Sequence, residues 1–180
     1  MLEDRLLVWK FKRGSTESLE KIYAKYETYL ITVATALLNN THAAEDVLHD
    51  LFVSFVESAE RIRLNGNLKA YLATCVANRA RNRIKRRQLE PTALDDNHEI
   101  ESVALGPDLL AIQKEETTIM NRALSHLPYE QREVVVLHLQ GDLKFTQIAE
   151  LRSTSVNTIR SRYRYGLEKL RSVLNGQVTE

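Results

Sequence analysis

The sequence contains few of the residues that interrupt helices. It has six glycines and three prolines in 180 residues, less than half of the roughly 12% that these two residues make up in an average protein. Most of them stand between segments rich in Leu, Ala, Glu, Lys and Arg, which favour helix. With a hydrophobic share of 43%, the chain has enough apolar side chains for a folded core. The sequence therefore predicts an all-α protein with short connections.

Cysteine, long apolar runs and catalytic motifs are also scarce. The single Cys75 excludes an intramolecular disulfide and a cysteine-based zinc site. The longest mainly apolar run, residues 29–38, is shorter than the roughly 20 residues of a membrane-spanning helix, and the start MLEDRL lacks the apolar segment of a signal peptide. We therefore expect a cytoplasmic protein without membrane insertion. Because no GxxxxGK[ST], GxGxxG or GxSxG motif occurs, we expect neither a cofactor nor enzyme activity.

The charges are segregated along the chain. Residues 1–89 carry a net charge of +5, residues 90–118 carry −7, and residues 119–180 carry +3. The acidic stretch contains three helix breakers and has no sustained helical period. We therefore expect two small helical domains, residues 1–89 and 118–180, joined by a flexible acidic linker over residues 90–117. Its acidity has two open interpretations, which are solvation of the tether and shielding of a basic surface until a polyanion competes.

Breakers and apolar periodicity together predict the helices. The first block is expected to form an N-terminal helical bundle, with Thr41 as the N-cap of its third helix. Three of its helices are expected over residues 2–11, 17–38 and 68–88. The helix that follows Thr41 is expected to have an apolar face whose last residue is Val56. In the second block Pro128 is expected to open a helix. The helices of that block are expected from about residue 115, from 128 to 140, over 145–151 and over 156–174.

A run of basic residues, RARNRIKRR, covers Arg79 to Arg87. Six of its nine residues are basic and none is acidic, and at helical spacing they surround more than one face of the helix. Such a concentration of positive charge repels itself unless a polyanion is present, which favours nucleic-acid contact. A solvated helix end, where cations are stabilised by the helix dipole, is the alternative.

A second pattern, FTQIAELRSTSVNTIRSRYRYGLEKLR, begins at Phe145 and predicts a helix-turn-helix. A short helix with a buried face is followed by a tight turn, and Ser155 is the expected N-cap of the next helix. The core face of that next helix is expected to consist of Val156, Ile159, Tyr163, Leu167, Leu170 and Leu174. Its opposite face carries polar side chains suited to base edges and phosphates in a major groove: Asn157, Thr158, Arg160, Ser161 and Arg164. An ordinary helical hairpin with a polar outer face is the alternative.

Two weaker signals concern metals and nucleophiles. Four potential ligands, His42, Glu45, His49 and Asp50, lie at helical spacing, but they form no HExxH motif and are more typical of a solvated helix face. Cys75 stands among apolar and aromatic neighbours, which favours a buried structural thiol over a nucleophile.

Three segments in order resemble the short extracytoplasmic-function (ECF) class of bacterial RNA polymerase sigma factors. AAEDVLHDLFVSFVE, residues 43–57, is similar to the family's segment that docks on the β′ coiled coil of the polymerase. LKAYLATCVANRARNRIKRR, residues 68–87, resembles its promoter-melting and −10-reading helix. LPYEQREVVVLHLQGDLKFTQIAELRSTSVNTIRSRYRYGLEKLR, residues 127–171, resembles its C-terminal helix-turn-helix domain for the −35 element.

The resemblance implies a sigma factor that binds core RNA polymerase and directs promoter recognition, DNA melting and transcription initiation. The residues implied at the β′ clamp are Asp46, His49, Asp50 and Phe52. The loop implied to hold an unstacked −10 base contains Arg61, Arg63, Asn65 and Asn67. The helix residues implied to lie along DNA beside it are Asn78, Arg79, Asn82, Arg83 and Arg86. The polar face from Asn157 to Arg164 would read or contact the −35 element, and the flanks of that domain would meet the β flap. An anti-sigma factor is a further partner that the resemblance leaves room for.

Several departures from the family pattern are visible, two of them at positions expected to matter for docking and for the turn. His49-Asp50 stands where the family usually has Gln-Glu, and Ser153 stands where the turn usually has glycine, so Ser153 must accept a strained backbone or reshape the turn.

Two other functions stay open at this point. A helix-turn-helix repressor or activator would bind duplex operator DNA without polymerase, and a helical metalloenzyme would use the His42 to Asp50 face. For the free sigma factor, we expect the two domains to pack together and cover their basic faces until core polymerase separates them.

Overall fold

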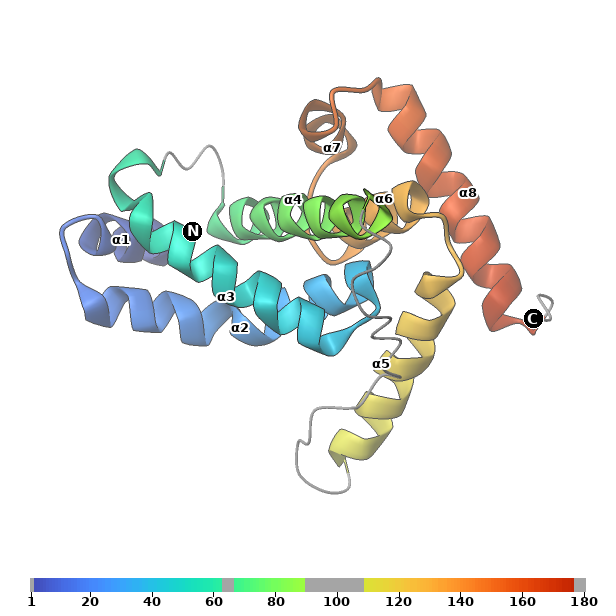
Figure 1. Cartoon of the computed structure of the whole chain (residues 1–180), viewed down its shortest axis with the longest axis horizontal. Helices are drawn as coiled ribbons and strands as arrows, with labels where there is room; N and C mark the ends of the chain where they lie inside the picture. The colour runs from blue at the N-terminus through green and yellow to red at the C-terminus, as the bar shows by residue number, and fades with distance from the viewer. Residues whose placement is uncertain (1, 63–66, 90–108, 177–180) are drawn as a thin grey trace.

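The computed structural model describes residues 2–62, 67–89 and 109–176, and these residues form helices and no strand (Figure 1). The first block contains α1 (Leu2–Phe11), α2 (Thr16–Leu38), α3 (Thr41–Glu57), the short 3-10 helix η1 (Ala59–Arg61) and α4 (Leu68–Leu89). The second contains α5 (Leu109–Ser125), α6 (Tyr129–Leu139), α7 (Phe145–Leu151) and α8 (Val156–Leu174). The all-α fold is therefore confirmed. Across the described ranges, no helix combines the length and apolar character that crossing a bilayer requires.

The first block is a bundle in which α2 packs against α1, α3 and α4. Long apolar side chains at helical spacing supply its core, and each removes most of its apolar surface from water. The side chains exposed by 1% or less include Ile22, Leu30, Val33, Leu51 and Leu72. The predicted apolar face of α3 is confirmed except at Val56, which is 47% exposed.

In the second block, α6 packs against α8, and α7 and α8 form the expected helix-turn-helix. Gly166 of α8 lies so close to α6 that an added Cβ would stand 2.9 Å from Val135 Cγ2. The predicted core face of α8 is buried at Ile159 and Leu170, whereas Leu174 at its end is 45% exposed. A glycine is therefore what allows these two helices to cross closely.

The helix ends follow the predicted signals with two differences. The N-cap of α3 is Asn40, whose Oδ1 accepts a hydrogen bond from Ala43 N at 2.7 Å, so the prediction of Thr41 was wrong by one residue. Asparagine is at least as good an N-cap as threonine, which explains the shift. The other difference is α5, which begins at Leu109 inside the stretch expected to be linker. Asp108 is the N-cap type of residue that could have indicated this start in the sequence.

The turn between α7 and α8 combines a strained residue with a capping residue. Ser153 has φ 48°, a left-handed conformation that is costly for a residue with a Cβ. Of the two alternatives for this glycine-like position, the structure shows the strained backbone. Ser155 is the predicted N-cap of α8, and its Oγ accepts a hydrogen bond from Thr158 N at 3.0 Å.

Ser153→Gly should stabilise the protein. Glycine adopts positive φ without the steric cost, which outweighs the extra freedom it gives the unfolded chain. We expect a gain of about 0.5–1 kcal/mol in the free energy of unfolding, measured by denaturant unfolding followed by circular dichroism.

Ser155→Gly is the matched control, because it makes the same chemical change two residues away. It removes the capping oxygen and should lower stability by a few tenths of a kcal/mol. Equal effects of the two substitutions would contradict the strain that we assign to Ser153.

Candidate nucleic-acid and polymerase interfaces

The predicted DNA-reading face of α8 lies in solvent. Asn157, Arg160, Ser161 and Arg164 are exposed and Thr158 is half-buried. Arg164 contacts only its own helix among the described residues, with its guanidinium 4.8 Å from the centroid of the Tyr165 ring and its Nε 4.0 Å from Glu168 Oε1. These side chains are therefore free to meet a nucleic acid along the N-terminal half of the helix.

The predicted DNA residues of α4 occupy different environments. Asn82 and Arg86 are exposed, whereas Arg79 lies along its own helix and donates to Cys75 O at 3.4 Å. Arg83 donates to Asp46 Oδ2 of α3 at 2.9 Å, so a residue expected at DNA is paired with one expected at polymerase. Both partners remain about half exposed, and such surface pairs contribute 0–1 kcal/mol.

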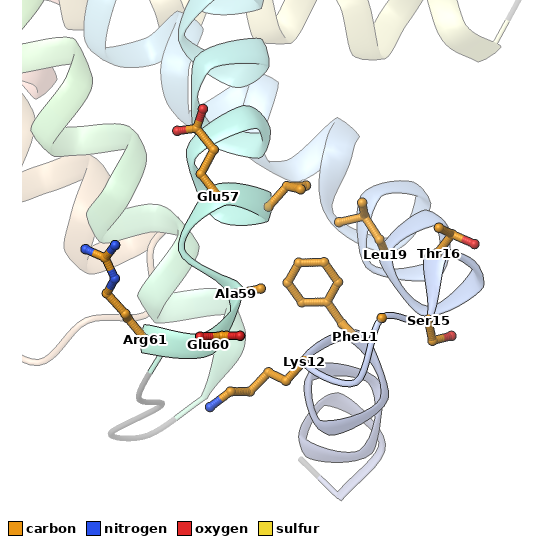
Figure 2. A pocket seen from close by; sticks show the side chains of 11 residues that line it. Phe11, Lys12, Ser15, Thr16, Leu19, Glu57, Ala59, Glu60 and Arg61 are labelled. Atoms are coloured by element: carbon orange, nitrogen blue, oxygen red, sulfur yellow. The ribbon is translucent and has the colours of Figure 1, made fainter.

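A cavity lies beside the start of the loop that leads into α4. Its volume is about 460 Å³, within the roughly 300–1,000 Å³ of small-molecule pockets. Figure 2 shows Phe11 and Leu19 on the side of the α1–α2 junction, with Glu60 and Arg61 on the η1 side. Lys12 joins the two sides, because its Nζ donates to Ile62 O at 3.2 Å. The cavity thus has apolar walls and a charged rim.

The predicted loop residues are only partly placed. Arg61 is exposed at the rim of this cavity. Asn67 caps α4, since its Oδ1 accepts from Ala70 N at 2.6 Å. Arg63 and Asn65 lie outside the described residues.

The predicted docking helix α3 presents three of its four expected residues to solvent. Asp46, His49 and Asp50 are exposed. Phe52 is 8% exposed, because its ring packs against Tyr23 with centroids 4.7 Å apart. Phe52 therefore belongs to the core of the bundle and cannot itself form a docking surface. Val53, which we did not predict, is 43% exposed on the same helix.

The two blocks meet at a carboxylate that the sequence did not single out. Glu133 of α6 is 1% exposed, and Arg81 of α4 reaches it from the first block. Arg81 Nε and Nη2 donate to Glu133 Oε1 and Oε2 at 3.2 and 2.7 Å. Arg152, in the helix-turn-helix, approaches the same carboxylate with Nε and Nη2, each at 2.8 Å from an oxygen. The Tyr129 hydroxyl donates to Oε1 at 3.0 Å. We call these four residues the Glu133 cluster.

The Glu133 cluster is polar but largely shielded from water. The Arg81 and Arg152 side chains are 22% and 8% exposed, and the Arg81 guanidinium lies 5.3 Å from the centroid of the Tyr129 ring. Burial, followed by the Glu133 carboxylate, raises the pKa of Tyr129, so the phenol stays a hydrogen-bond donor. Hydrogen bonding to Glu133 raises the pKa of Arg81.

Two further polar contacts cross between the blocks. Arg152 Nη1 donates to Asn78 Oδ1 at 2.9 Å, which brings a predicted −10 residue against the helix-turn-helix. Arg132 Nη1 donates to Leu37 O at the end of α2 at 3.1 Å. The Arg132 Nε and the Tyr29 hydroxyl are buried without a hydrogen-bond partner among the described residues. The interface is thus only partly satisfied, which lowers the free energy needed to open it.

The weak metal and nucleophile signals gain no support. In the parts of the chain that the structure covers, no group of three or more His, Cys, Asp or Glu side chains is placed to hold a metal ion. His42 Nδ1 and Glu45 Oε2 are 3.8 Å apart on an exposed surface. Burial raises the pKa of the Cys75 thiol, which suits a structural role.

Comparisons with known proteins agree with the two blocks and their order. A family model described as "Sigma-70 region 2" matches residues 22–90, and one described as "Sigma-70, region 4" matches residues 118–170. The ECF RNA polymerase sigma factor SigW of Bacillus subtilis is 22% identical over 91% of this chain and 92% of its own length. The RNA polymerase sigma factor CarQ of Myxococcus xanthus is 25% identical over 92% of this chain and 94% of its own.

Solved structures share the fold over almost the whole chain. CnrH, in complex with the cytosolic domain of CnrY, superimposes with a TM-score of 0.66 at 17% identity, covering 98% of this chain and 99% of that one. The sigma factor RpoE of Bartonella quintana, in complex with the anti-sigma factor NepR, gives a TM-score of 0.68 at 24% identity, covering 89% and 98%.

The repressor and metalloenzyme alternatives have no support in these matches. A region 2 domain followed by a region 4 domain is the arrangement of sigma factors, which are regulatory proteins without catalytic activity of their own. The chain therefore belongs to the sigma-70 family, as an ECF-class sigma factor that directs RNA polymerase to promoters.

Proposed function

We propose that residues 1–89 dock on the β′ coiled coil and bind the opened −10 element, while residues 118–180 bind the −35 element and meet the β flap. The observation that carries this division is that the exposed polar face of α8 belongs to a region 4 domain, whereas the basic helix α4 belongs to a separate region 2 domain. The chain works as a regulatory subunit and not as an enzyme.

The −35 element is bound by the N-terminal half of α8. Its exposed residues suit this use, because arginine donates in pairs to guanine edges and phosphates, and asparagine and serine bond bases or backbone. The side chains that we assign to the contact are Asn157, Thr158, Arg160, Ser161 and Arg164.

The −10 element is bound as single-stranded DNA along α4 and the preceding loop. Asn78, Arg79, Asn82, Arg83 and Arg86 contact the strand, and the loop from Arg61 to Asn67, with Arg63 and Asn65, holds an unstacked base. The cavity between Phe11 and Arg61 supports this assignment, since it has apolar walls and a charged rim at Arg61, where that loop begins. Base stacking and phosphate contacts together favour such binding.

Promoter opening in this proposal uses binding free energy alone. Unstacking a base costs a few kcal/mol, and contacts to the captured strand offset that cost at about 1–3 kcal/mol for each stacked base. Thermal opening of the duplex is thus trapped by the protein and needs no nucleotide hydrolysis.

The docking surface on α3 consists of Asp46, His49, Asp50 and Val53. An apolar side chain between exposed polar ones is a common composition for a protein interface. Phe52 supports this surface from below through its packing in the core.

An anti-sigma factor is a further partner in this proposal. The support is the whole-chain similarity to CnrH and RpoE, whose structures contain CnrY and NepR.

The direct test mixes the purified chain with bacterial core RNA polymerase. We expect co-elution on gel filtration and discrete run-off transcripts from a fragmented genomic library of the host. Duplex binding by the chain alone, without co-elution or transcripts, would contradict the proposal.

Asp50→Lys should weaken co-elution with core polymerase at least tenfold, because it reverses the charge at the centre of the docking surface. Asp50 is chosen over Asp46 because Asp46 is paired with Arg83. The measurement is a titration of core polymerase against the fluorescently labelled chain.

Glu20→Lys is the control for this titration. It makes a similar charge reversal at an exposed position of α2 in the same domain. If it weakened binding as much as Asp50→Lys, net charge rather than the α3 surface would explain the loss.

Arg160→Ala combined with Arg164→Ala should reduce −35-dependent initiation without unfolding the protein, since both side chains are exposed. Each lost phosphate contact should also lower the slope of log K against log salt by about one. Transcription from a promoter found by the run-off experiment measures the first effect, and duplex binding at several salt concentrations measures the second.

A template with a scrambled −35 element and the control pair Lys169→Ala with Arg171→Ala complete this experiment. The control removes the same charge from exposed positions nearer the C-terminus of α8. An equal loss on native and scrambled templates would argue against specific readout by Arg160 and Arg164.

A further inference from the structure

The contact between Arg81 and Glu133 has the chemistry of a DNA contact. The guanidinium gives two parallel hydrogen bonds to a carboxylate, at 3.2 and 2.7 Å, which is also how arginine binds a phosphate. Arg81 belongs to the basic stretch of α4, between Asn78 and Asn82 of the proposed −10 surface. An acidic side chain of the second domain thus pairs with an arginine of the proposed DNA-binding helix and uses its hydrogen-bond donors.

The second contact of the cluster involves the same surface. Asn78 Oδ1 accepts from Arg152 Nη1 at 2.9 Å, so the proposed −10 residue Asn78 is held by the residue that starts the turn before α8. The second domain packs on α4 through α6, and Arg152 brings the start of the turn before α8 to the part of α4 that a −10 strand would follow.

In this arrangement the two proposed DNA-binding surfaces are closer together than the two elements of a promoter. Elements near positions −35 and −10 are about 25 base pairs apart, which is about 85 Å of duplex at 3.4 Å per pair. A short loop of three residues separates Arg152 from α8, and the proposed −35 residues lie in the first three helical turns of α8. Because Arg152 is hydrogen-bonded to Asn78, these residues lie within about 35 Å of Asn78. The described arrangement of the domains cannot bind both elements of a straight promoter.

Separation of the domains affects the two arginines of the Glu133 cluster differently. Arg152 and Tyr129 belong to the same domain as Glu133, so the carboxylate keeps two partners when the domains separate. Arg81 returns to water, where its charge is solvated. Opening therefore leaves no buried charge unpaired, whereas removing Glu133 would leave Arg152 buried without its partner.

We propose that Glu133 takes the place of a DNA phosphate on Arg81 in the free protein, and that single-stranded DNA opens the two domains by competing for Arg81. Arg81 is then a further DNA contact of α4, covered until the domains separate. This inference rests on the proposed role of α4 at the −10 element.

The test measures the separation of the domains in the full-length chain by fluorescence energy transfer. Dyes are attached at Glu20→Cys in α2 and Lys169→Cys in α8, both exposed, with Cys75→Ser to remove the native thiol. The probe is a 20-nucleotide oligothymidylate, and its binding is followed separately by anisotropy. We expect high energy transfer in the free chain and a decrease on adding the oligonucleotide.

Arg81→Ala should increase the open fraction about tenfold without DNA, which corresponds to about 1.4 kcal/mol. Lys85→Ala removes the same charge from an exposed position on the same helix and should leave energy transfer unchanged. Asn78→Asp should act in the opposite direction, because a carboxylate facing Arg152 strengthens the closed form, so energy transfer without DNA should be at least as high as in the unsubstituted chain.

Two results would overturn the proposal. One is energy transfer in Arg81→Ala equal to that of the unsubstituted chain, with circular dichroism showing both folded. The other is tight binding of the oligonucleotide without any decrease in energy transfer. Failure of the sigma-factor function is recognised separately, because it would appear as missing co-elution and transcripts in the polymerase experiment while the effects of Arg81→Ala on domain separation remained.

Discussion

A carboxylate enclosed by protein must be paired, and the pairing of Glu133 organises much of this structure. Within the second domain, Glu133 connects α6 through Arg152 to the turn that precedes α8. Tyr129, one helical turn earlier, donates to the same carboxylate. Across the domains, Arg81 uses the remaining hydrogen-bonding capacity of the two oxygens. One side chain thus connects α6 both to the turn before α8 and to α4 of the first domain.

The helices were largely predictable because local signals control where helices begin and end. Breakers and caps placed α1, α7 and α8 at their observed bounds, and Ser155 acts as the cap that its position indicated. Asn40 was missed in favour of Thr41 because both residue types cap helices. The early start of α5 was missed because the breakers Gly106 and Pro107 indicated a linker. The exposed polar face of α8 followed from helical period alone.

The contact between the domains could not be predicted in the same way. Arg81 and Glu133 are 52 residues apart in the sequence, and no periodic pattern relates them. Helix α6 is buried from Glu133 through Leu137, so its pattern does not separate an inward face from an outward one. An acid directly before three consecutive valines was the available signal, and its meaning depends on arginines supplied from elsewhere. The burial of Phe52 agrees with the apolar period of its helix, whereas its expected place at the docking surface came from the family resemblance and not from that period.

The close crossing at Gly166 determines how the second domain can move. With Val135 Cγ2 only 2.9 Å from the position of a Cβ on this glycine, α6 and α8 interlock without room to slide. Glu133 lies two residues from Val135, so the carboxylate and the recognition helix travel as a single rigid body. In the proposed opening, separation from Arg81 is then a hinge motion between intact modules, on the microsecond-to-millisecond timescale of such motions, and the exposed polar face of α8 keeps its shape throughout.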